Sequence, residues 1–572
     1  MKRIFCWVSF ISLAACGFML MLGLILRNDS LMAASPFALL PAGLLIAAVS
    51  FVLIVRWLFS WRNLKRALKV VGVFGIFGII FYVEEDVRGW LAWHHIKQQA
   101  EAAGERLDFA SIIPSPIPDD KNFALTPVVA SSYEFVLTKD GKRIDPPNTN
   151  VVNRMKMSTY QTGMTDTPTN ANWVRGGFTD FKAWQTYYRM PETNSNGVTN
   201  EFPIAPQPQV PAVDVLLALS EYDLTLEELR QASLLPDSRF PLNYNSEHPF
   251  ETMLPHLASI KRCAQVLQLR ALAELEVEQS DKALDDVKLS LRLIDSIRTE
   301  PLLISHLVRI ACLSITMQPI WEGVNKHEWS DAQLAEIEQE LGKLDFLTDS
   351  KLAMRGERNS SLAYIEHMRR HRSYDDFRNL VSFDFNEIDR HWKWSEFPMV
   401  VLYHLAPDGW FYQNEATIVK LHQEFWLPTT DPIKHLAIPT MSQKANATIS
   451  SLNGMPWNYF DRAFLPALGA AQRKFAYYQE TADLAQLGCA LERYRLAHKQ
   501  FPETIDALAP QFIAQIPHDV IGGQPLHYRR KTDGKFLLYS IGWNETDEGG
   551  QIGLSDSGSF RNDKGDWVWL NP

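Results

Sequence analysis

Four side chains with oxygen ligands lie close together in a glycine-rich stretch near the end of the chain. They are Asn544, Asp547, Glu548 and Asp556. Calcium takes oxygen ligands from flexible loops, so this stretch predicts a calcium site. The alternative is that these residues only form turns, because Asp and Asn favour turns beside glycine. No other cofactor is expected from the sequence.

A second group of ionisable residues has the composition of a hydrolytic site. Asp384, Glu387, Asp389 and His391 could serve as general acid and base if they faced one cleft. The alternative is a solvated surface, because charged residues are mostly exposed. No P-loop, GxSxG elbow or HExxH zinc helix occurs in a credible setting, so no catalytic residue is assigned.

Paired histidines also occur without the rest of a metal site. His367 and His371 are four residues apart, which would place both rings on one side of a helix. Arginines surround them, and no glutamate of an HExxH motif lies between them. We therefore expect a solvated helical face here rather than a zinc site.

Charge and cysteine content exclude several classes of protein. The formal net charge is −10, and basic residues are interspersed with acidic ones, so no nucleic-acid partner is expected. The five cysteines are scattered and form no CxxC pair, which argues against a zinc knuckle or a disulfide framework. A single disulfide among Cys263, Cys312 and Cys489 stays open for an oxidising compartment.

Three apolar runs occupy the first 83 residues. They cover residues 4–26, 37–59 and 68–83 and predict three transmembrane helices. Basic residues precede the first run and follow the second, whereas Glu84, Glu85 and Asp86 follow the third. Because basic loops stay in the cytoplasm, we expect a multi-pass protein of the inner (plasma) membrane. Its N-terminus would be cytoplasmic and its large C-terminal part extracytoplasmic, with the lipid bilayer as its first partner.

Two alternatives to this topology stay open. The third run has only 16 residues, and a re-entrant or interfacial helix there would leave the large domain in the cytoplasm. Leu13-Ala14-Ala15-Cys16-Gly17 has the form of a lipoprotein cleavage site, which would place a lipid on Cys16. Apolar residues continue to Leu26, which favours a plain membrane helix.

The sequence after Val83 divides by composition. We expect a transmembrane region over 1–83, a helical stem and proline-rich strap over 84–129, a loop-rich segment with short strands over 130–212, an α-helical domain over 213–460 and a small α+β module over 461–572. The helical domain has the spacing of an antiparallel bundle or short solenoid. Within it, Ser330 is placed to cap a helix that starts at Asp331.

The C-terminal module carries a family resemblance. A helix from Thr481 to His498 is followed by Phe501-Pro502, then by proline-bounded and glycine-punctuated strands that end at Gly550. This order of landmarks resembles the C-terminal domain of the major pseudopilins of type II secretion, in which strands pack on a long helix. Some pseudopilins hold calcium in the following loop. The N-terminus departs from the family, because Leu22 stands where the mature pseudopilin has its glutamate after the glycine of cleavage.

These observations predict a membrane-anchored α+β protein: three N-terminal transmembrane helices, a mainly α-helical soluble domain and a small pseudopilin-like α+β unit. The favoured function is interaction or scaffolding with other proteins of the bacterial-type cell envelope. One alternative is an extracytoplasmic hydrolase with a carboxylate and histidine site between the helical domain and the C-terminal module. A third possibility is a regulator that faces the cytoplasm, which requires that the third apolar run does not cross the membrane.

Overall fold

A computed structural model describes most of the chain after Ser60. The described residues are 52, 61–133, 136–137, 143–144, 154–161, 167–168, 171–190, 192–194, 197–199, 202–244, 249–373, 397–452 and 456–572. The chain forms two compact units, Met1–Val87 and Arg88–Pro572. The second unit is called the body below.

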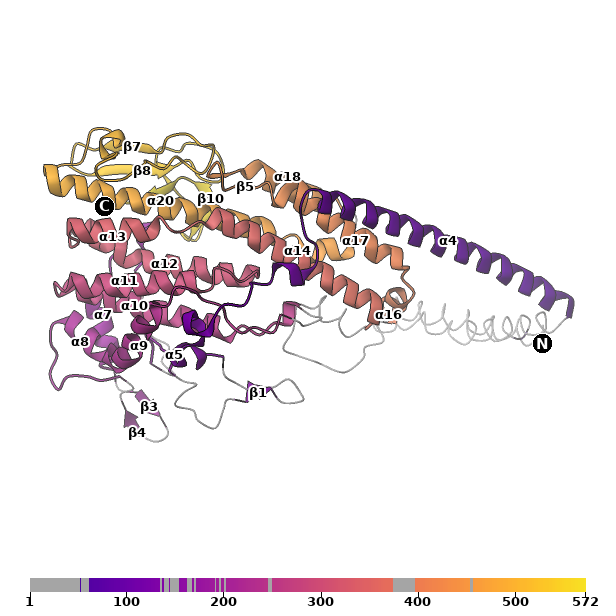
Figure 1. The fold of residues 1–572 in the computed structure, drawn as a ribbon, viewed down its shortest axis with the longest axis horizontal. Helices are drawn as coiled ribbons and strands as arrows, with labels where there is room; N and C mark the ends of the chain where they lie inside the picture. Colours follow the sequence, from indigo (N-terminus) through magenta and orange to yellow (C-terminus); the bar gives the residue numbers. More distant parts are fainter. Residues whose placement is uncertain are drawn as a thin grey trace, which may run out of the picture. The chain divides into compact units, whose positions relative to one another are not determined.

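Helices dominate the described residues (Figure 1). They are α4 (Trp61–Ala102), α5 (Pro127–Ala130), α7 (Phe181–Tyr188), α8 (Pro211–Leu219), α9 (Asp223–Ser233), α10 (Pro255–Glu276), α11 (Ser280–Ser296), α12 (Leu303–Asn325), α13 (Asp331–Leu341), α14 (Phe346–His371), α16 (Phe397–His404), α17 (Asp408–Leu421), α18 (Pro439–Ser451), α19 (Tyr459–Phe464) and α20 (Leu468–His498). A π-helical turn, His422–Trp426, extends α17. Residues 103–126, called the strap, carry short 3-10 turns between prolines after α4 ends.

The long helices of the body pack side by side. α10, α11 and α12 contact one another, and α20 lies against α12, α13 and α14. Ser330 caps α13 and forms a capping box with Gln333, which confirms the predicted helix start.

Short strands make up the rest of the regular structure, and among them β8, β10 and β11 lie against α20. They are β1 (Val136–Leu137), β2 (Arg143–Ile144), β3 (Glu192–Asn194), β4 (Gly197–Thr199), β5 (Thr430–Asp431), β6 (Leu436–Ala437), β7 (His527–Arg530), β8 (Phe536–Ser540), β9 (Ile552–Leu554), β10 (Phe560–Gly565) and β11 (Trp567–Trp569). The largest sheet has the order β11-β8-β7 and is antiparallel throughout. Its register places Trp567 opposite Ser540 and Tyr528 opposite Leu538. β9 and β10 form a separate hairpin.

One hydrophobic core joins the helices to these strands. Buried side chains from Phe123 to Trp569 belong to the same cluster. Trp321 on α12 donates its indole N–H to the carbonyl of Leu570, at 2.8 Å. The ring of Trp569 lies so close to Gly488 on α20 that a Cβ there would meet it at 2.8 Å. The C-terminal strands therefore complete the core of the helices, since three short strands cannot enclose one of their own.

The predicted fold class is wrong. The structure is mostly helical with a small β region, rather than an α+β protein behind three transmembrane helices. In the part of the chain that the structure describes, one helix has the length and composition of a membrane span. That helix is α12, and 61% of its most apolar window is buried inside the body, as in a core helix.

The structure describes the three predicted membrane spans to different extents. Those over 4–26 and 37–59, together with Cys16, lie outside the described residues except for Val52. The third, 68–83, lies within α4, which continues without a break to Ala102. The helix runs on through Glu84, Glu85 and Asp86 into the residues predicted to form a helical stem.

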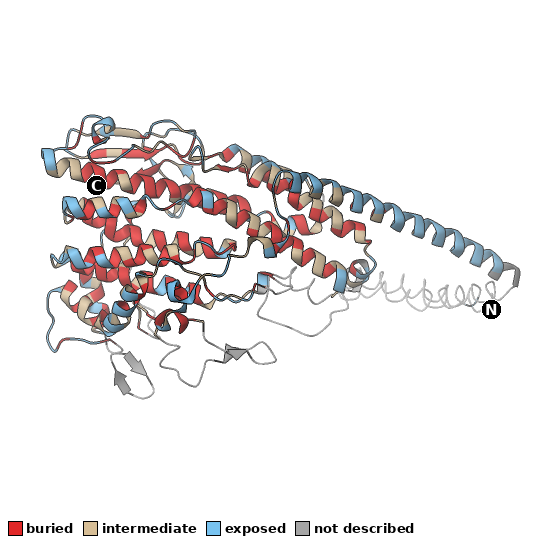
Figure 2. Ribbon diagram, viewed as in Figure 1, coloured by how far each residue is buried: buried red, intermediate tan, exposed pale blue. Residues whose placement is uncertain are grey.

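The first half of α4 has an unusual surface. Every large apolar side chain from Leu68 to Val83 is 38–71% exposed, on all sides of the helix. Figure 2 shows this contrast, with the first half of α4 exposed and the long helices of the body mostly buried. An apolar surface of this extent marks an interaction site for protein or lipid.

Candidate functional site

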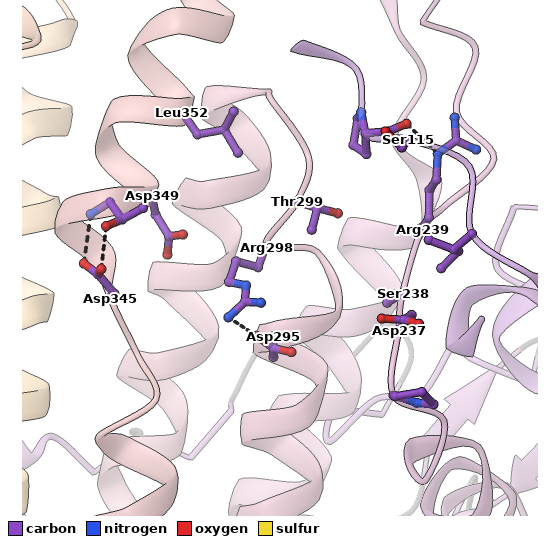
Figure 3. A pocket seen from close by; sticks show the side chains of 14 residues that line it. Ser115, Asp237, Ser238, Arg239, Asp295, Arg298, Thr299, Asp345, Asp349 and Leu352 are labelled. Atoms are coloured by element: carbon purple, nitrogen blue, oxygen red, sulfur yellow. Dashed lines mark hydrogen bonds and ion pairs between the residues drawn. The ribbon is translucent and has the colours of Figure 1, made fainter. Parts of the chain in front are cut away.

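A polar cavity of about 520 Å³ opens where the end of α11, the start of α14 and two loops meet (Figure 3). Its volume is in the range of small-molecule sites. It is lined by Pro114, Ser115, Ile117, Pro236, Asp237, Ser238, Arg239, Asp295, Arg298, Thr299, Asp345, Thr348, Asp349 and Leu352. The first three residues come from the strap, and the next four from the loop after α9. Four carboxylates and two guanidinium groups therefore share one cavity.

The α14 wall of this cavity carries the most buried carboxylate. Asp349 is 5% exposed, and one of its oxygens accepts a hydrogen bond from the buried Arg309 on α12. Burial raises the pKa of Asp349, although Arg309 opposes that shift. Asp345 caps α14 instead, because its carboxylate accepts the backbone N–H of Thr348 at 2.9 Å.

The other walls hold groups that are already paired. Arg298 lies 3.4 Å from Asp295, and Arg292 contacts the second oxygen of the same carboxylate at 3.4 Å. Arg239 donates its Nε–H to the carbonyl of Pro114 at 3.0 Å, which ties the strap to the loop after α9. Among the described residues, the lining contains no histidine or cysteine. Its carboxylates and guanidinium groups can bind a ligand through hydrogen bonds and ion pairs.

A buried polar cluster lies behind the loop between α11 and α12. The Nε2 atom of His256 lies 2.8 Å from Glu300, and Ser305 donates its hydroxyl to the other oxygen of Glu300. His256, Glu300 and Ser305 are all at most 2% exposed. These three residue types also occur in catalytic sites, but here solvent and substrate cannot reach them. Their hydrogen bonds instead fix the loop between α11 and α12.

A second arrangement of histidines and carboxylates lies between the β5–β6 hairpin and α20. The Nε2 atom of His435 lies 2.7 Å from Asp483 on α20. Gln479 donates to the other oxygen of Asp483 at 3.1 Å, which fixes the carboxylate. The hydrogen bond to Asp483 raises the pKa of His435, against the effect of burial. His435 also has a positive φ of 51°, which is uncommon outside glycine, and its ring meets that of His518.

Two further carboxyl groups adjoin this hairpin junction. Glu480 is fully buried and accepts the backbone N–H of Val520 at 2.9 Å, while its other oxygen has no hydrogen-bond partner. Burial, then Asp519 and Asp483, raise the pKa of Glu480 well above its usual value. Asp519 accepts bonds from Ser540 and from the backbone of Ile521 and Ile541. These acids hold the strand region to α20.

The predicted calcium residues lie in two separate turns. Asn544, Asp547 and Glu548 share the loop after β8, whereas Asp556 lies in the turn between β9 and β10. Asn544 donates to Glu548 at 2.6 Å, and Asp547 accepts the hydroxyl of Tyr539 at 3.1 Å. These bonds leave the residues engaged in shaping the loop, and calcium binding by them stays a prediction.

The organising residue of that loop is one that the sequence had not indicated. Asp566 is fully buried and accepts backbone N–H groups of Glu548, Gly550 and Gln551. It lies ten residues beyond Asp556 and is the single residue between β10 and β11. The only signal for it was an acid directly before the apolar Trp-Val-Trp strand.

The structure places the two paired histidines on the same side of α14. His367 and His371 stack on α14 with ring centroids 4.1 Å apart, and His371 contacts the carbonyl of His367 through Nδ1. Among the residues that the structure describes, no group of three or more His, Cys, Asp or Glu side chains could hold a metal ion. Asp384, Glu387, Asp389 and His391 lie outside the described residues.

Cysteine oxidation is also limited by burial. Cys263, Cys312 and Cys489 are free and buried. Burial raises the pKa of the Cys263 and Cys312 thiols to about 12, so neither is a thiolate at neutral pH.

No family model, curated protein or solved structure matches this chain.

Proposed function

We propose that this protein is a membrane-bound binding protein of the cell envelope, with a role in interaction or scaffolding. In this proposal the apolar half of α4 lies in the bilayer, and the body lies outside the cytoplasm. The body offers partners a rigid helical surface and the polar cavity between α11 and α14.

The exposed apolar surface of α4 carries this proposal. Water disfavours such a surface by roughly 25 cal/mol for each Å² exposed, and lipid removes that cost. The run is shorter than the about 20 residues of a typical span. Lys69 can extend its stem toward the interface at one end, and Trp90 is an interfacial residue type at the other.

The polar cavity supports binding rather than turnover. Its lining combines hydroxyl groups, carboxylates and guanidinium groups, and most of these are held by partners in the protein. Such preorganised polar groups orient a ligand at little entropic cost. A soluble ligand or a side chain from a partner protein would fill a cavity of this size.

The proposal is tested by the location of the body and by what binds to it. A reporter enzyme that is active only outside the cytoplasm, fused after Pro572, should be active, and alkaline carbonate should leave the protein in the membrane pellet. Crosslinking in intact cells, followed by mild detergent extraction, should recover envelope proteins. Release of the protein by carbonate, or reporter activity only in the cytoplasm, would refute the proposal.

A second candidate function is the extracytoplasmic hydrolase. It is favoured by the hairpin junction, where His435 and Asp483 meet between the helical region and the C-terminal strands. A carboxylate that orients a histidine is part of many general-base sites. Purified protein would be assayed against ester, peptide and glycoside substrates. Activity that H435Q and D483N abolish, and that the exposed control H498Q keeps, would establish this function, and inactivity of the wild type would reject it.

A further inference from the structure

A second cavity, called the stem cavity, lies beside the last part of α4. It has a volume of about 650 Å³ and is entirely within the body. Its walls come from α4, the strap, α14 and α17, and they include Trp93, Lys97, Glu366, Arg369, Tyr412 and Glu415. Ala100, Leu107, Leu362 and Val419 form a separate buried cluster that fixes these elements against one another.

Glu415 on α17 is the exceptional residue of this lining. It is only 3% exposed, yet it contributes to the cavity wall. Among the described residues, no donor forms a hydrogen bond or an ion pair with its carboxyl group. A buried carboxyl without a partner is costly, so its retention beside an open cavity points to a ligand.

The neighbouring charged groups are mostly committed to one another. Glu366 binds Arg369 at 2.9 Å and Arg370 at 2.6 Å. Glu105 binds Arg355 and Arg358, the latter at 3.0 Å. Glu415 is thus the buried acid of the cavity that has no ion pair with the described part of the protein, and the nearby charges of Arg369, Lys97 and Arg370 only partly offset its burial.

We propose that the stem cavity binds a ligand with an ammonium group, and that the Glu415 carboxylate is its counter-ion. An ammonium group would supply both the opposite charge and the hydrogen-bond donors that Glu415 lacks. An anionic ligand would instead meet an unpaired carboxyl group. The inference goes beyond the proposed function, because it names the chemical class of a ligand. A soluble amine and the headgroup of an ethanolamine lipid both belong to this class.

The protonation state of Glu415 makes the proposal measurable as proton release on ligand binding. Burial, and then the charge of Glu366, raise the pKa of Glu415 to about 8. At pH 7 about nine-tenths of the molecules therefore hold this proton, and an ammonium ligand must displace it. The other titratable or charged groups that face Glu415 from α4, the strap, α14 and α17 are His94, Lys97, Glu101, Glu105, Arg106, Asp108, Glu366, Arg369, Arg370 and Tyr412.

The experiment measures binding of ethanolamine to the full-length protein in an uncharged, amine-free detergent by titration calorimetry. The expected result is binding with release of about 0.9 proton at pH 7, and an affinity that rises about tenfold per pH unit up to about pH 8. E415Q should weaken binding at least tenfold, whereas E424Q, which changes a half-exposed acid just beyond α17, should not. Equal binding to E415Q, no binding by the wild type, or equal binding of uncharged ethylene glycol would overturn the proposal.

Two further measurements test the proposal on the wild-type protein, so that a misfolded E415Q variant cannot mislead. They also identify the source of the amine. Infrared difference spectra of the wild type should lose a protonated carboxyl band when ethanolamine is added, and that band should be missing from folded E415Q. Nanodiscs with phosphatidylethanolamine should show the same loss if the ligand is a lipid headgroup, whereas nanodiscs with phosphatidylcholine should not. A response to free ethanolamine alone would identify a soluble amine, and an unchanged band in every arm would overturn the proposal.

Discussion

Two long helices, α4 and α12, are both rich in apolar residues, but their surroundings are opposite. The large apolar side chains of α4 between Leu68 and Val83 are 38–71% exposed. In α12 the side chains of Ile310, Leu313, Met317 and Ile320 are at most 3% exposed. The difference shows that apolar composition alone does not separate an exposed helix from a core helix.

The polar residues of the two helices explain the difference. α12 carries Arg309 and Gln318 on its buried surface, and both have partners in the body, Asp349 and the backbone of Trp173. The apolar half of α4 has no such residue between Val70 and Val83. A helix whose buried polar groups are satisfied by neighbouring protein belongs to a core, whereas a helix without polar groups can be surrounded by lipid.

The largest expected effect concerns the buried charge of α12. R309M leaves Asp349 without its counter-ion and should lower the free energy of unfolding by about 3 to 5 kcal/mol at pH 7. R298M is the control, because the Arg298 side chain is 51% exposed and should cost less than about 0.5 kcal/mol. Urea denaturation measures both. A loss below about 1 kcal/mol for R309M would show that the polar groups of α12 do not define it as a core helix.

The double variant R309M/D349L sharpens this result. Replacing both partners removes the buried charge together with its counter-ion, so most of the lost stability should return. If the double variant is as unstable as R309M, the loss arises from the shape of the Arg309 side chain rather than from its charge.

The next effect tests whether the C-terminal strands share the core of α12. W569A removes a fully buried ring that packs on α20 and should cost about 3 to 5 kcal/mol. Thermal unfolding of the body should remain a single transition with a lower midpoint. L554A, which changes a 43% exposed residue on β9, is the control. A W569A protein that loses only a separate, minor transition would show that the strands are an independent module.

The sequence predicted parts of this architecture. The cap at Ser330 occurs as expected, and helices occupy most of residues 255–341. The sequence could not show that the C-terminal strands complete the helical core, because the contact between Trp569 and Gly488 joins residues 81 positions apart. For the same reason, the sequence does not single out Glu415 or Asp349, and only the folded chain places them in cavity walls.

The third effect concerns α4 itself. I79K places a charge within the exposed apolar segment and should oppose membrane insertion by about 2.5 to 3.5 kcal/mol. The share of protein in the membrane pellet after carbonate extraction should fall. Q98K, at an exposed site further along the same helix, should leave the distribution unchanged. Equal retention of I79K and wild type would argue that the apolar half of α4 does not enter lipid.

The smallest effect is expected at the hairpin junction. The pKa of His435 is raised in the folded protein, so its pairing with Asp483 stabilises the fold at pH values below about 6.5 and is lost as pH rises through the raised value. H435Q should therefore reduce stability at pH 5.5, by less than about 1 kcal/mol because the side chain is 33% exposed, and hardly at all at pH 9. Urea denaturation at the two pH values checks the sign. A larger loss at pH 9 would contradict the pairing.

The most direct test of the account compares chemical access to the two kinds of surface. Single cysteines would replace Ile76, in the apolar half of α4, and Leu224, an 82% exposed residue of α9, in protein held in native membranes. A membrane-impermeant maleimide should label I76C only after detergent is added and should label L224C at once from the extracytoplasmic side. Rapid labelling of I76C in intact membranes would contradict the claim that lipid covers this helix.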